Sequence, residues 1–324
     1  NGFLSGVSLD GKKFFYVNPL ASAGNHHRSE WFGCSCCPTN VVRTVPSVPG
    51  CAYATDDEAI YVNLYAAGTA EIDHPKGKVT LTQETRYPWD GAVTVRVEPE
   101  TPTALALALR IPAWAEGETR TEGLYRLGPA VSPPPVGVKV NGEAVGAREV
   151  KDGYVRLDRT WTKGDTVELA LPMPVCRVHA HDEVEADRGR VALQRGPVVY
   201  CFEGVDNEHL AHAYLPPDAA IRAERRPDLL GGVTVLVAEG KVRRAGGEDT
   251  AVTLTAVPYY AWDHREPGPM RVWIPEDRKV ARPVPKPTVA SESKPTASHC
   301  WHMDTVAALN DQVLPKSSVD HEIP

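Results

Sequence analysis

From about residue 51 onward, apolar and polar residues alternate in short runs, and Gly, Pro or Asp separates each run from the next. A period of two puts alternate side chains on one face of a strand, so this pattern predicts antiparallel β-sheet. The runs are Ile60–Tyr65, Gly77–Thr82, Ala92–Glu98, Leu105–Ile111, Gly137–Val140 with an Asn-Gly turn, Tyr154–Leu157 and Asp165–Leu171. Strands at this spacing predict a first β-sandwich over residues 51–175.

A second all-β domain is predicted over residues 176–277. Its runs are Val191–Leu193, Val198–Phe202, Val233–Ala238, Ala251–Ala256 and Met270–Ile274. Residues 116–136, which include three successive prolines, interrupt the first sandwich and predict a surface loop. The predicted fold class is therefore mainly β, with two consecutive antiparallel β-sandwich domains.

The two ends of the chain do not follow this pattern. In residues 1–20, an Asp-Gly turn and the aromatic run Phe14–Val17 predict a hairpin that leads out of a helix. Pro38 favours the start of a short helix, which we expect Pro46 and Pro49 to end early. Residues 278–324 are rich in Pro, Lys, Ser and Thr, which predicts an extended linker followed by the start of a further C-terminal module.

Length and charge exclude some classes of protein. The chain has 324 residues and a formal net charge of −7, whereas a nucleic-acid-binding protein would be expected to carry a basic stripe. No run of about 18 apolar residues predicts a membrane span. We therefore expect about two domains and no nucleic-acid or membrane partner.

The strongest chemical signal is a cluster of cysteines near the N-terminus. Cys34, Cys36 and Cys37 are three of only seven cysteines in the chain. Closely spaced thiolates suit zinc, which favours the ionised form of its sulfur ligands. Two other interpretations are a disulfide to a distant cysteine and buried, inert thiols, although an odd number of cysteines at irregular spacing fits a disulfide framework poorly.

A structural zinc site has four ligands, so at least one must come from outside the cysteine cluster. The nearest candidates are His26, His27 and Glu30. Other candidate functional residues have simpler interpretations. We expect core packing for Trp114, Trp161, Trp262 and Trp273 rather than sugar stacking, plain surface histidines at His179 and His181, and a chance cluster at His299, Cys300 and His302.

Around the cysteines the chain resembles the zinc-dependent β-L-arabinofuranosidase family of glycoside hydrolases, family 127. The most specific segment is Gly33–Asn40, which reads Gly-Cys-Ser-Cys-Cys-Pro-Thr-Asn. Further similar segments follow in the family's order and span most of residues 1–280: Leu9–Lys12, Phe14–Leu20, Ile60–Tyr65, Tyr87–Gly91, Leu109–Ala115, Val191–Tyr200 and Pro258–Trp262.

The resemblance implies roles for two cysteines. Cys36 would be the nucleophile of a retaining glycosidase and a zinc ligand, and Cys37 a second zinc ligand. The family's other ligands form a Glu-x-Cys motif in an (α/α)₆ catalytic barrel, and its acid/base is another Glu; all of these would lie upstream of residue 1. Residues 1–50 would then be the C-terminal remnant of that barrel, and the fragment alone is expected to be inactive.

The implied substrate is a β-L-arabinofuranoside or a related plant-derived oligosaccharide, from which L-arabinofuranose is released. A second hypothesis of another class is a non-catalytic β-sandwich accessory or carbohydrate-binding unit that retains the thiols as a remnant. Reduced thiols bound to zinc favour a cytoplasmic location.

Overall fold

The computed structural model describes residues 1–119, 121–128, 134–146, 149–286, 294 and 296. Contacts group the chain into two compact units. The first, called here the terminal unit, consists of Asn1–Cys34, Asp182–Leu193 and Val199–Pro324. The second, called here the sandwich unit, consists of Ser35–His181 and Gln194–Val198. The domain boundaries predicted from the sequence, at residues 50, 175 and 277, stay a prediction.

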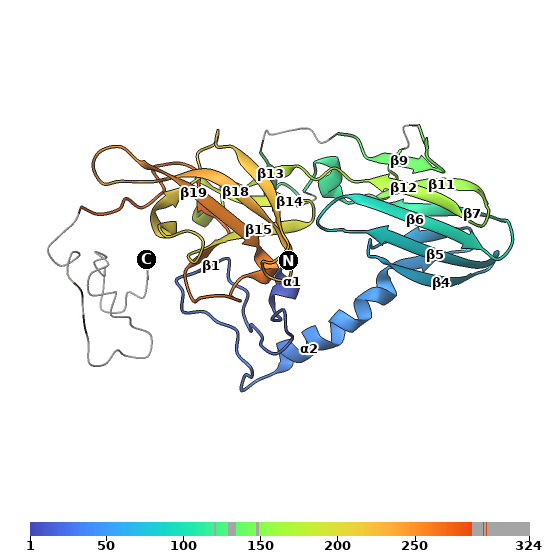
Figure 1. The fold of residues 1–324 in the computed structure, drawn as a ribbon, viewed down its shortest axis with the longest axis horizontal. Helices are drawn as coiled ribbons and strands as arrows, with labels where there is room; N and C mark the ends of the chain where they lie inside the picture. The colour runs from blue at the N-terminus through green and yellow to red at the C-terminus, as the bar shows by residue number, and fades with distance from the viewer. Residues whose placement is uncertain (120, 129–133, 147–148, 287–293, 295, 297–324) are drawn as a thin grey trace. The chain divides into compact units, whose positions relative to one another are not determined.

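The sandwich unit contains two β-sheets, drawn in blue to green in Figure 1. Six strands form one sheet, in the order β10 (Glu143–Ala144), β9 (Gly137–Val140), β12 (Asp165–Ala170), β6 (Ala92–Pro99), β5 (Gly77–Thr85) and β4 (Gly68–His74). Four strands form the other, in the order β11 (Tyr154–Trp161), β7 (Thr103–Arg110), β3 (Ala59–Val62) and β2 (Tyr53–Thr55). These strands confirm the predicted β-rich architecture.

One hydrophobic core fills the sandwich unit, and the alternation along its strands explains how. On β6, Val93, Val95 and Val97 are buried while the residues between them are more exposed. Leu105, Leu107 and Leu109 of β7 belong to the same core cluster. Trp161 is fully buried and its indole N–H donates to the carbonyl of Leu105 at 3.1 Å, so its one polar group is satisfied. The expected role of this tryptophan in the core is confirmed.

Two expectations for the sandwich unit are wrong in detail. Strands β3 and β7 pair in parallel, since Ala59–Val62 run alongside Ala106–Leu109 in the same direction. Alternation predicts which face a residue occupies, but not the direction of a partner strand that lies 47 residues further along the chain. The segment expected to be a surface loop, 116–136, also contains strand β8 (Tyr125–Leu127), which pairs with β13 (Val175–Ala180).

Gly91 lies where the backbone of the sandwich unit has no room for a side chain. A Cβ atom on Gly91 would lie 1.9 Å from the carbonyl oxygen of Leu171, while the Gly91 carbonyl accepts the Leu171 N–H at 2.9 Å. We therefore expect Gly91→Ala to lower the free energy of unfolding by about 2 kcal/mol. Urea denaturation can test this against Gly50→Ala, whose added methyl group meets nothing within 4 Å. Equal stability of the two variants would contradict the expectation.

The terminal unit is built on antiparallel strands, drawn from yellow to orange in Figure 1. Its main strands follow in the order β16 (Ala213–Tyr214), β18 (Val233–Val242), β19 (Thr250–Pro258), β15 (Val198–Glu203) and β14 (Arg190–Arg195), the last of which begins in this unit. Shorter partners are β17 (Ile221–Arg226) on β18, β20 (Met270–Arg271) between β15 and β1 (Ala21–Ser22), and β21 (Ile274–Pro275) on β14. The strands predicted at Val191–Leu193, Val198–Phe202, Val233–Ala238 and Ala251–Ala256 are confirmed, whereas the single strand predicted at Met270–Ile274 is divided into β20 and β21, which pair with different strands.

Helices in the described residues are few and short. The α-helices are α1 (Gly2–Ser5) and α2 (Cys36–Thr44), and the 3₁₀ helices are η1 (Val45–Cys51), η2 (Ala113–Glu116), η3 (Glu185–Asp187), η4 (Leu210–His212) and η5 (Tyr259–Ala261). In the part of the chain that the structure describes, no helix is long and apolar enough to cross a membrane. The predicted N-terminal hairpin is confirmed by α1 and by the antiparallel bridge between Val7 and Phe14.

The helix after the cysteines begins earlier than predicted and ends before Pro46, as predicted. It begins at Cys36 rather than at Pro38, because proline is tolerated anywhere in the first turn, where backbone N–H groups have no acceptor within the helix. It ends at Thr44, so the early end expected from Pro46 and Pro49 is confirmed, and the chain continues as the 3₁₀ helix η1 to Cys51. As a result, both cysteines of the adjacent pair lie in the first turn of α2.

Candidate thiol site

Cys36 and Cys37 are the first two residues of α2, and both are exposed. Their Sγ atoms lie 3.8 Å apart. Two side chains of the motif fix this turn, since the Thr39 hydroxyl donates to the carbonyl of Ser35 at 2.8 Å and the Asn40 amide donates to that of Cys36 at 2.7 Å. The Cys-Cys-Pro-Thr-Asn sequence thus holds two adjacent thiols together at the beginning of a helix.

The start of α2 favours negative charge on these sulfur atoms. A helix carries partial positive charge at its N-terminus, where the first N–H groups have no acceptor within the helix. The residue before the helix, Ser35, makes no side-chain capping hydrogen bond to these groups. An anionic ligand or a thiolate in the first turn is therefore stabilised by the helix.

The cysteines do not form the disulfide that the sequence left open. None of the six cysteines among the described residues is in a disulfide, and 3.8 Å is well beyond an S–S bond of about 2.05 Å. The interpretation as an inert, buried thiol applies instead to Cys201, and Cys176 is half-buried; burial raises the pKa of both thiols. Cys34, Cys36, Cys37 and Cys51 are exposed.

The separation of the paired sulfur atoms matches what one zinc ion requires. Two thiolates bound tetrahedrally at Zn–S distances of about 2.3 Å lie about 3.8 Å from each other. The sulfur atoms of Cys36 and Cys37 already have that spacing. Among the described residues, however, no group of three or more His, Cys, Asp or Glu side chains is arranged to hold a metal. The pair therefore fits half of a tetrahedral ligand set.

The histidines considered as further ligands have other contacts. One imidazole nitrogen of His26 lies 2.9 Å from the carbonyl of Val17, and its ring stacks on Phe15 with centroids 4.9 Å apart. His27 lies 2.7 Å from a carboxylate oxygen of Asp263. The cluster His299, Cys300 and His302 lies outside the described residues. His179 and His181 belong to no metal-binding group in the described part of the chain; His181 is exposed as a surface histidine, whereas His179 is half-buried.

The segment that leads to the cysteines is attached to the terminal unit at several points. Ser29 and Phe14 exchange two backbone hydrogen bonds, of 2.8 and 2.9 Å. The ring of Tyr16 meets Phe32 edge-on at 5.4 Å, and its hydroxyl lies 3.8 Å from the sulfur of Cys34, within the range for a hydrogen bond to sulfur. The chain therefore reaches Cys34 along a path that backbone and aromatic contacts define.

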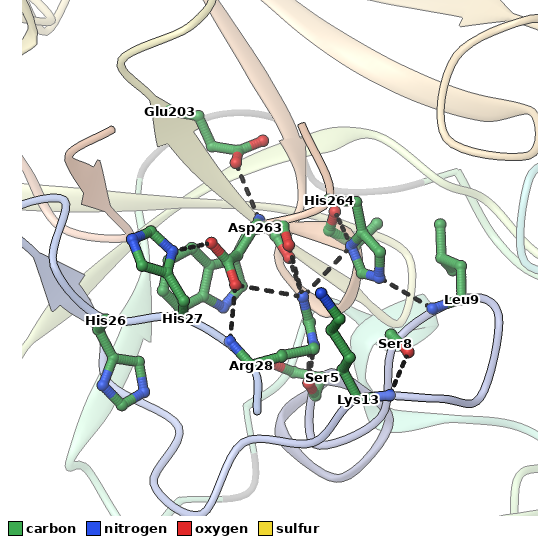
Figure 2. A network of polar contacts seen from close by, with 12 residues as sticks. Ser5, Ser8, Leu9, Lys13, His26, His27, Arg28, Glu203, Asp263 and His264 are labelled. Carbon is green, nitrogen blue, oxygen red and sulfur yellow. Dashed lines mark hydrogen bonds and ion pairs between the residues drawn. The ribbon is translucent and has the colours of Figure 1, made fainter. Parts of the chain in front are cut away.

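Arg28 makes several further contacts that attach this segment (Figure 2). Its guanidinium is 2% exposed and lies over the ring of Phe15, 4.1 Å from the centroid. It donates to the carbonyls of Ser5 at 2.9 Å, Trp262 at 2.5 Å and Asp263 at 3.1 Å. Burial lowers the pKa of Arg28 to about 10, against the attraction of the nearby Asp263 carboxylate. A buried cation with this many acceptors stabilises one arrangement of the N-terminal segment.

Asp263 and His264 complete this network from the other end of the sequence, as Figure 2 shows. The Asp263 carboxylate accepts the Arg28 backbone N–H at 3.0 Å and faces the His27 ring. The Leu9 N–H donates to Nε2 of His264 at 2.8 Å, so the neutral ring carries its proton on Nδ1, which donates to the carbonyl of Ala261. Burial, and then Arg28, lower the pKa of His264.

The sequence analysis did not find Arg28, Asp263 or His264. Arg28 is separated from Asp263 by 235 residues, and neither residue lies in a recognisable motif of its own. The one local signal was the series Pro258–Trp262, which resembles the family and immediately precedes Asp263. Trp262 itself is 2% exposed, so the core role expected for it is confirmed.

Three consecutive segments of the chain match models of known protein domains. Residues 1–50 match the β-L-arabinofuranosidase GH127 catalytic domain, residues 59–173 the GH127 middle domain, and residues 175–275 the glycoside hydrolase family 127 C-terminal domain. A non-reducing end β-L-arabinofuranosidase of Bifidobacterium longum subsp. longum is 36% identical over 84% of this chain and 43% of its own length.

Solved structures give the same result. A GH127 β-arabinofuranosidase is 40% identical and has a TM-score of 0.84, over 89% of this chain and 45% of its own. A GH127 β-L-arabinofuranosidase from Geobacillus stearothermophilus T6 is 38% identical with a TM-score of 0.74, over 86% of this chain and 45% of its own. The chain thus spans less than half the length of these relatives. It belongs to glycoside hydrolase family 127.

Proposed function

We propose that this chain is part of a retaining glycoside hydrolase that releases L-arabinofuranose from β-L-arabinofuranosides, with Cys36 as its nucleophile. The observation that carries the proposal is the pair of exposed thiols at the start of α2, 3.8 Å apart, in a chain of family 127. The relatives named above as β-L-arabinofuranosidases support the choice of substrate.

In this proposal the two cysteines have different tasks. The Cys36 sulfur, ionised at the positive end of α2, attacks the anomeric carbon as the bond to the departing oxygen breaks. A glutamic acid, which we place upstream of residue 1, donates a proton to that oxygen. Water activated by the same glutamate then displaces the sulfur, which leaves as the thiolate, so the sugar keeps its anomeric configuration.

Cys36 and Cys37 would both bind zinc, and the 3.8 Å between their sulfur atoms fits this role. When bound, zinc would supply positive charge that keeps the sulfur atoms ionised at neutral pH. The remaining ligands would come from the catalytic domain upstream, since the described residues offer only part of a tetrahedral set. In this proposal Cys37 does not react with the sugar, and its role is to hold the zinc ion beside Cys36.

Zinc analysis of the full-length protein tests this arrangement. We expect about one zinc ion per protein in the wild type, and a drop in zinc affinity of at least about tenfold in Cys37→Ser, because one of four ligands is lost. Cys51→Ser is the matched control, since Cys51 is also exposed but lies at the end of η1, outside the motif. Hydrolysis of p-nitrophenyl arabinofuranoside should fall with the zinc content.

The outcomes separate the two functional hypotheses. Zinc content and hydrolysis that are equal in Cys37→Ser and Cys51→Ser would contradict the assignment of Cys37 as a ligand. A full-length protein that contains no zinc and hydrolyses no arabinofuranoside would contradict the proposed enzyme and favour the non-catalytic accessory unit.

A further inference from the structure

A cavity of about 440 Å³ lies within the sandwich unit, where residues of η2 and β8 form part of its lining. Its volume is in the range of pockets that hold small molecules, about 300–1,000 Å³. None of its lining residues belongs to the thiol motif, and the proposed function does not use it. The lining combines aromatic, charged, hydroxyl and amide side chains, among them Arg110, Trp114, Thr119, Tyr125, Asp152 and Gln194.

The wall that carries Trp114 is held in place by contacts within the sandwich unit. The Tyr65 hydroxyl donates to the carbonyl of Arg110 at 2.6 Å. Trp114 is half-buried, packs against the hydrophobic core, and stacks on Tyr87 with ring centroids 6.4 Å apart. Because these contacts already fix the tryptophan, a ligand that packs on it would cost little additional ordering.

Hydroxyl groups hold a second wall. The Thr119 hydroxyl donates to the carbonyl of Tyr125 at 2.9 Å, and the Thr121 hydroxyl donates to that of Thr119 at 3.1 Å. The Tyr125 N–H in turn donates to the Thr121 hydroxyl at 3.1 Å. These bonds fix the three residues relative to one another, so this wall is also formed before a ligand binds.

Other polar groups of the cavity keep their capacity for hydrogen bonds. The Gln194 amide N–H donates to the carbonyl of Gly196 at 2.8 Å, whereas its amide oxygen has no partner among the described residues. Arg110 and Asp152 are exposed, and neither forms an ion pair with another residue that the structure describes. The cavity therefore offers a ligand both donors and acceptors.

The balance of these groups indicates the class of ligand. A ligand without polar groups would leave them unpaired, at a cost in desolvation. An anion would meet the carboxylates of Glu118 and Asp152, and only one guanidinium among the described lining residues, that of Arg110. A neutral sugar fits better, because its hydroxyl groups both donate and accept, and the C–H groups of its ring can pack on an aromatic side chain.

We propose that this cavity binds one residue of a neutral sugar, which packs on Trp114 and forms hydrogen bonds with Arg110 and Gln194. The cavity would bind the sugar without cleaving it. The proposal does not depend on the glycosidase activity, because it rests on a different set of residues of the same unit.

Sugar binding to the full-length protein tests the proposal. The probes are L-arabinose, D-galactose and D-glucose, each titrated by ligand-observed NMR, with sodium glucuronate as a charged sugar. We expect at least one neutral sugar to bind with a Kd of about 1 mM, since a single sugar residue makes few contacts. Glucuronate should bind more weakly than this sugar, because its carboxylate would face those of Glu118 and Asp152.

Arg110→Met removes hydrogen-bond donors from the cavity, and the exposed position of Arg110 leaves the core intact. We expect it to weaken binding of the effective sugar at least about fivefold, because a charged donor is lost. The matched control is Arg96→Met, which replaces an exposed arginine on β6 of the same unit, outside the cavity. Both variants should hydrolyse p-nitrophenyl arabinofuranoside at the same rate.

Trp114→Leu provides a second variant, which keeps an apolar side chain against the core and removes the ring. It should weaken binding at least about tenfold, and Arg110→Met decides the question if Trp114→Leu fails to fold. The proposal is overturned if none of the three neutral sugars binds, or if Arg110→Met binds the effective sugar as tightly as Arg96→Met does. Loss of hydrolysis together with binding in Arg110→Met would also overturn it, since the sugar would then be bound where the reaction takes place.

Discussion

Replacing Cys36 with alanine should lower kcat for an arabinofuranoside by at least about a thousandfold in the full-length protein. The reason is that a retaining mechanism without its nucleophile has no route to the covalent intermediate. The position of Cys36 in the first turn of α2, with its carbonyl held by Asn40, leaves the sulfur exposed and the turn intact when the thiol is removed. The fold should therefore survive the substitution, and circular dichroism can verify this.

Two further measurements distinguish a nucleophile from a residue that only supports the site. A slow substrate should label the wild-type protein with one sugar, and mass spectrometry of its peptides should place that sugar on Cys36. Cys51→Ala is the control, since it removes an exposed thiol outside the motif and should keep full activity. Activity in Cys36→Ala within tenfold of the control, or a label on a carboxylate, would refute the assigned role.

Replacing Arg28 with methionine should lower the free energy of unfolding by about 3 kcal/mol. The substitution keeps the contact with Phe15 but leaves the buried carbonyls of Ser5 and Trp262 without their donor. It also removes the positive charge beside the Asp263 carboxylate, which is 10% exposed. Breaking a buried charged network by removing one partner is among the most destabilising substitutions known.

Urea denaturation followed by tryptophan fluorescence can measure this effect, because Trp262 lies in the same network. Arg222→Met removes an exposed arginine from the same unit and should change the stability by less than about 0.5 kcal/mol. If Arg28→Met and Arg222→Met unfold at the same urea concentration, the network of Figure 2 does not stabilise the terminal unit as we infer.

The strands could be predicted wherever alternation was strong. On β6 and β7 every second residue is a large aliphatic residue that faces the core, so the pattern alone located both strands. Strand β4, Gly68–His74, was not predicted, because only Ile72 and His74 of its residues are buried and its alternation is weak. The parallel pairing of β3 with β7 depends on the path of the chain between them, which local pattern does not encode.

At the thiol site, too, features set by neighbouring residues could be predicted from the sequence, whereas contacts between distant residues could not. Cys36 and Cys37 are adjacent in sequence, so the sequence was sufficient to propose them as one site, and the family of the chain is confirmed. The roles of nucleophile and zinc ligand stay predictions. The attachment of the preceding segment through Arg28, Asp263 and His264 could not be predicted, since the acceptors are main-chain carbonyls whose positions only the folded chain defines.

The burial of Cys201 has a practical consequence for the study of this protein. It lies on β15, opposite Val257 of β19, with 0% of its surface exposed, and burial raises the pKa of its thiol. An alkylating reagent can reach this sulfur only when β15 separates from its neighbours, whereas Cys34 and Cys51 are accessible in the native state. The accessible thiols can first be blocked with an alkylating reagent of natural isotope composition. The rate at which Cys201 then reacts with an isotopically heavy form of the same reagent measures how often the sheet opens.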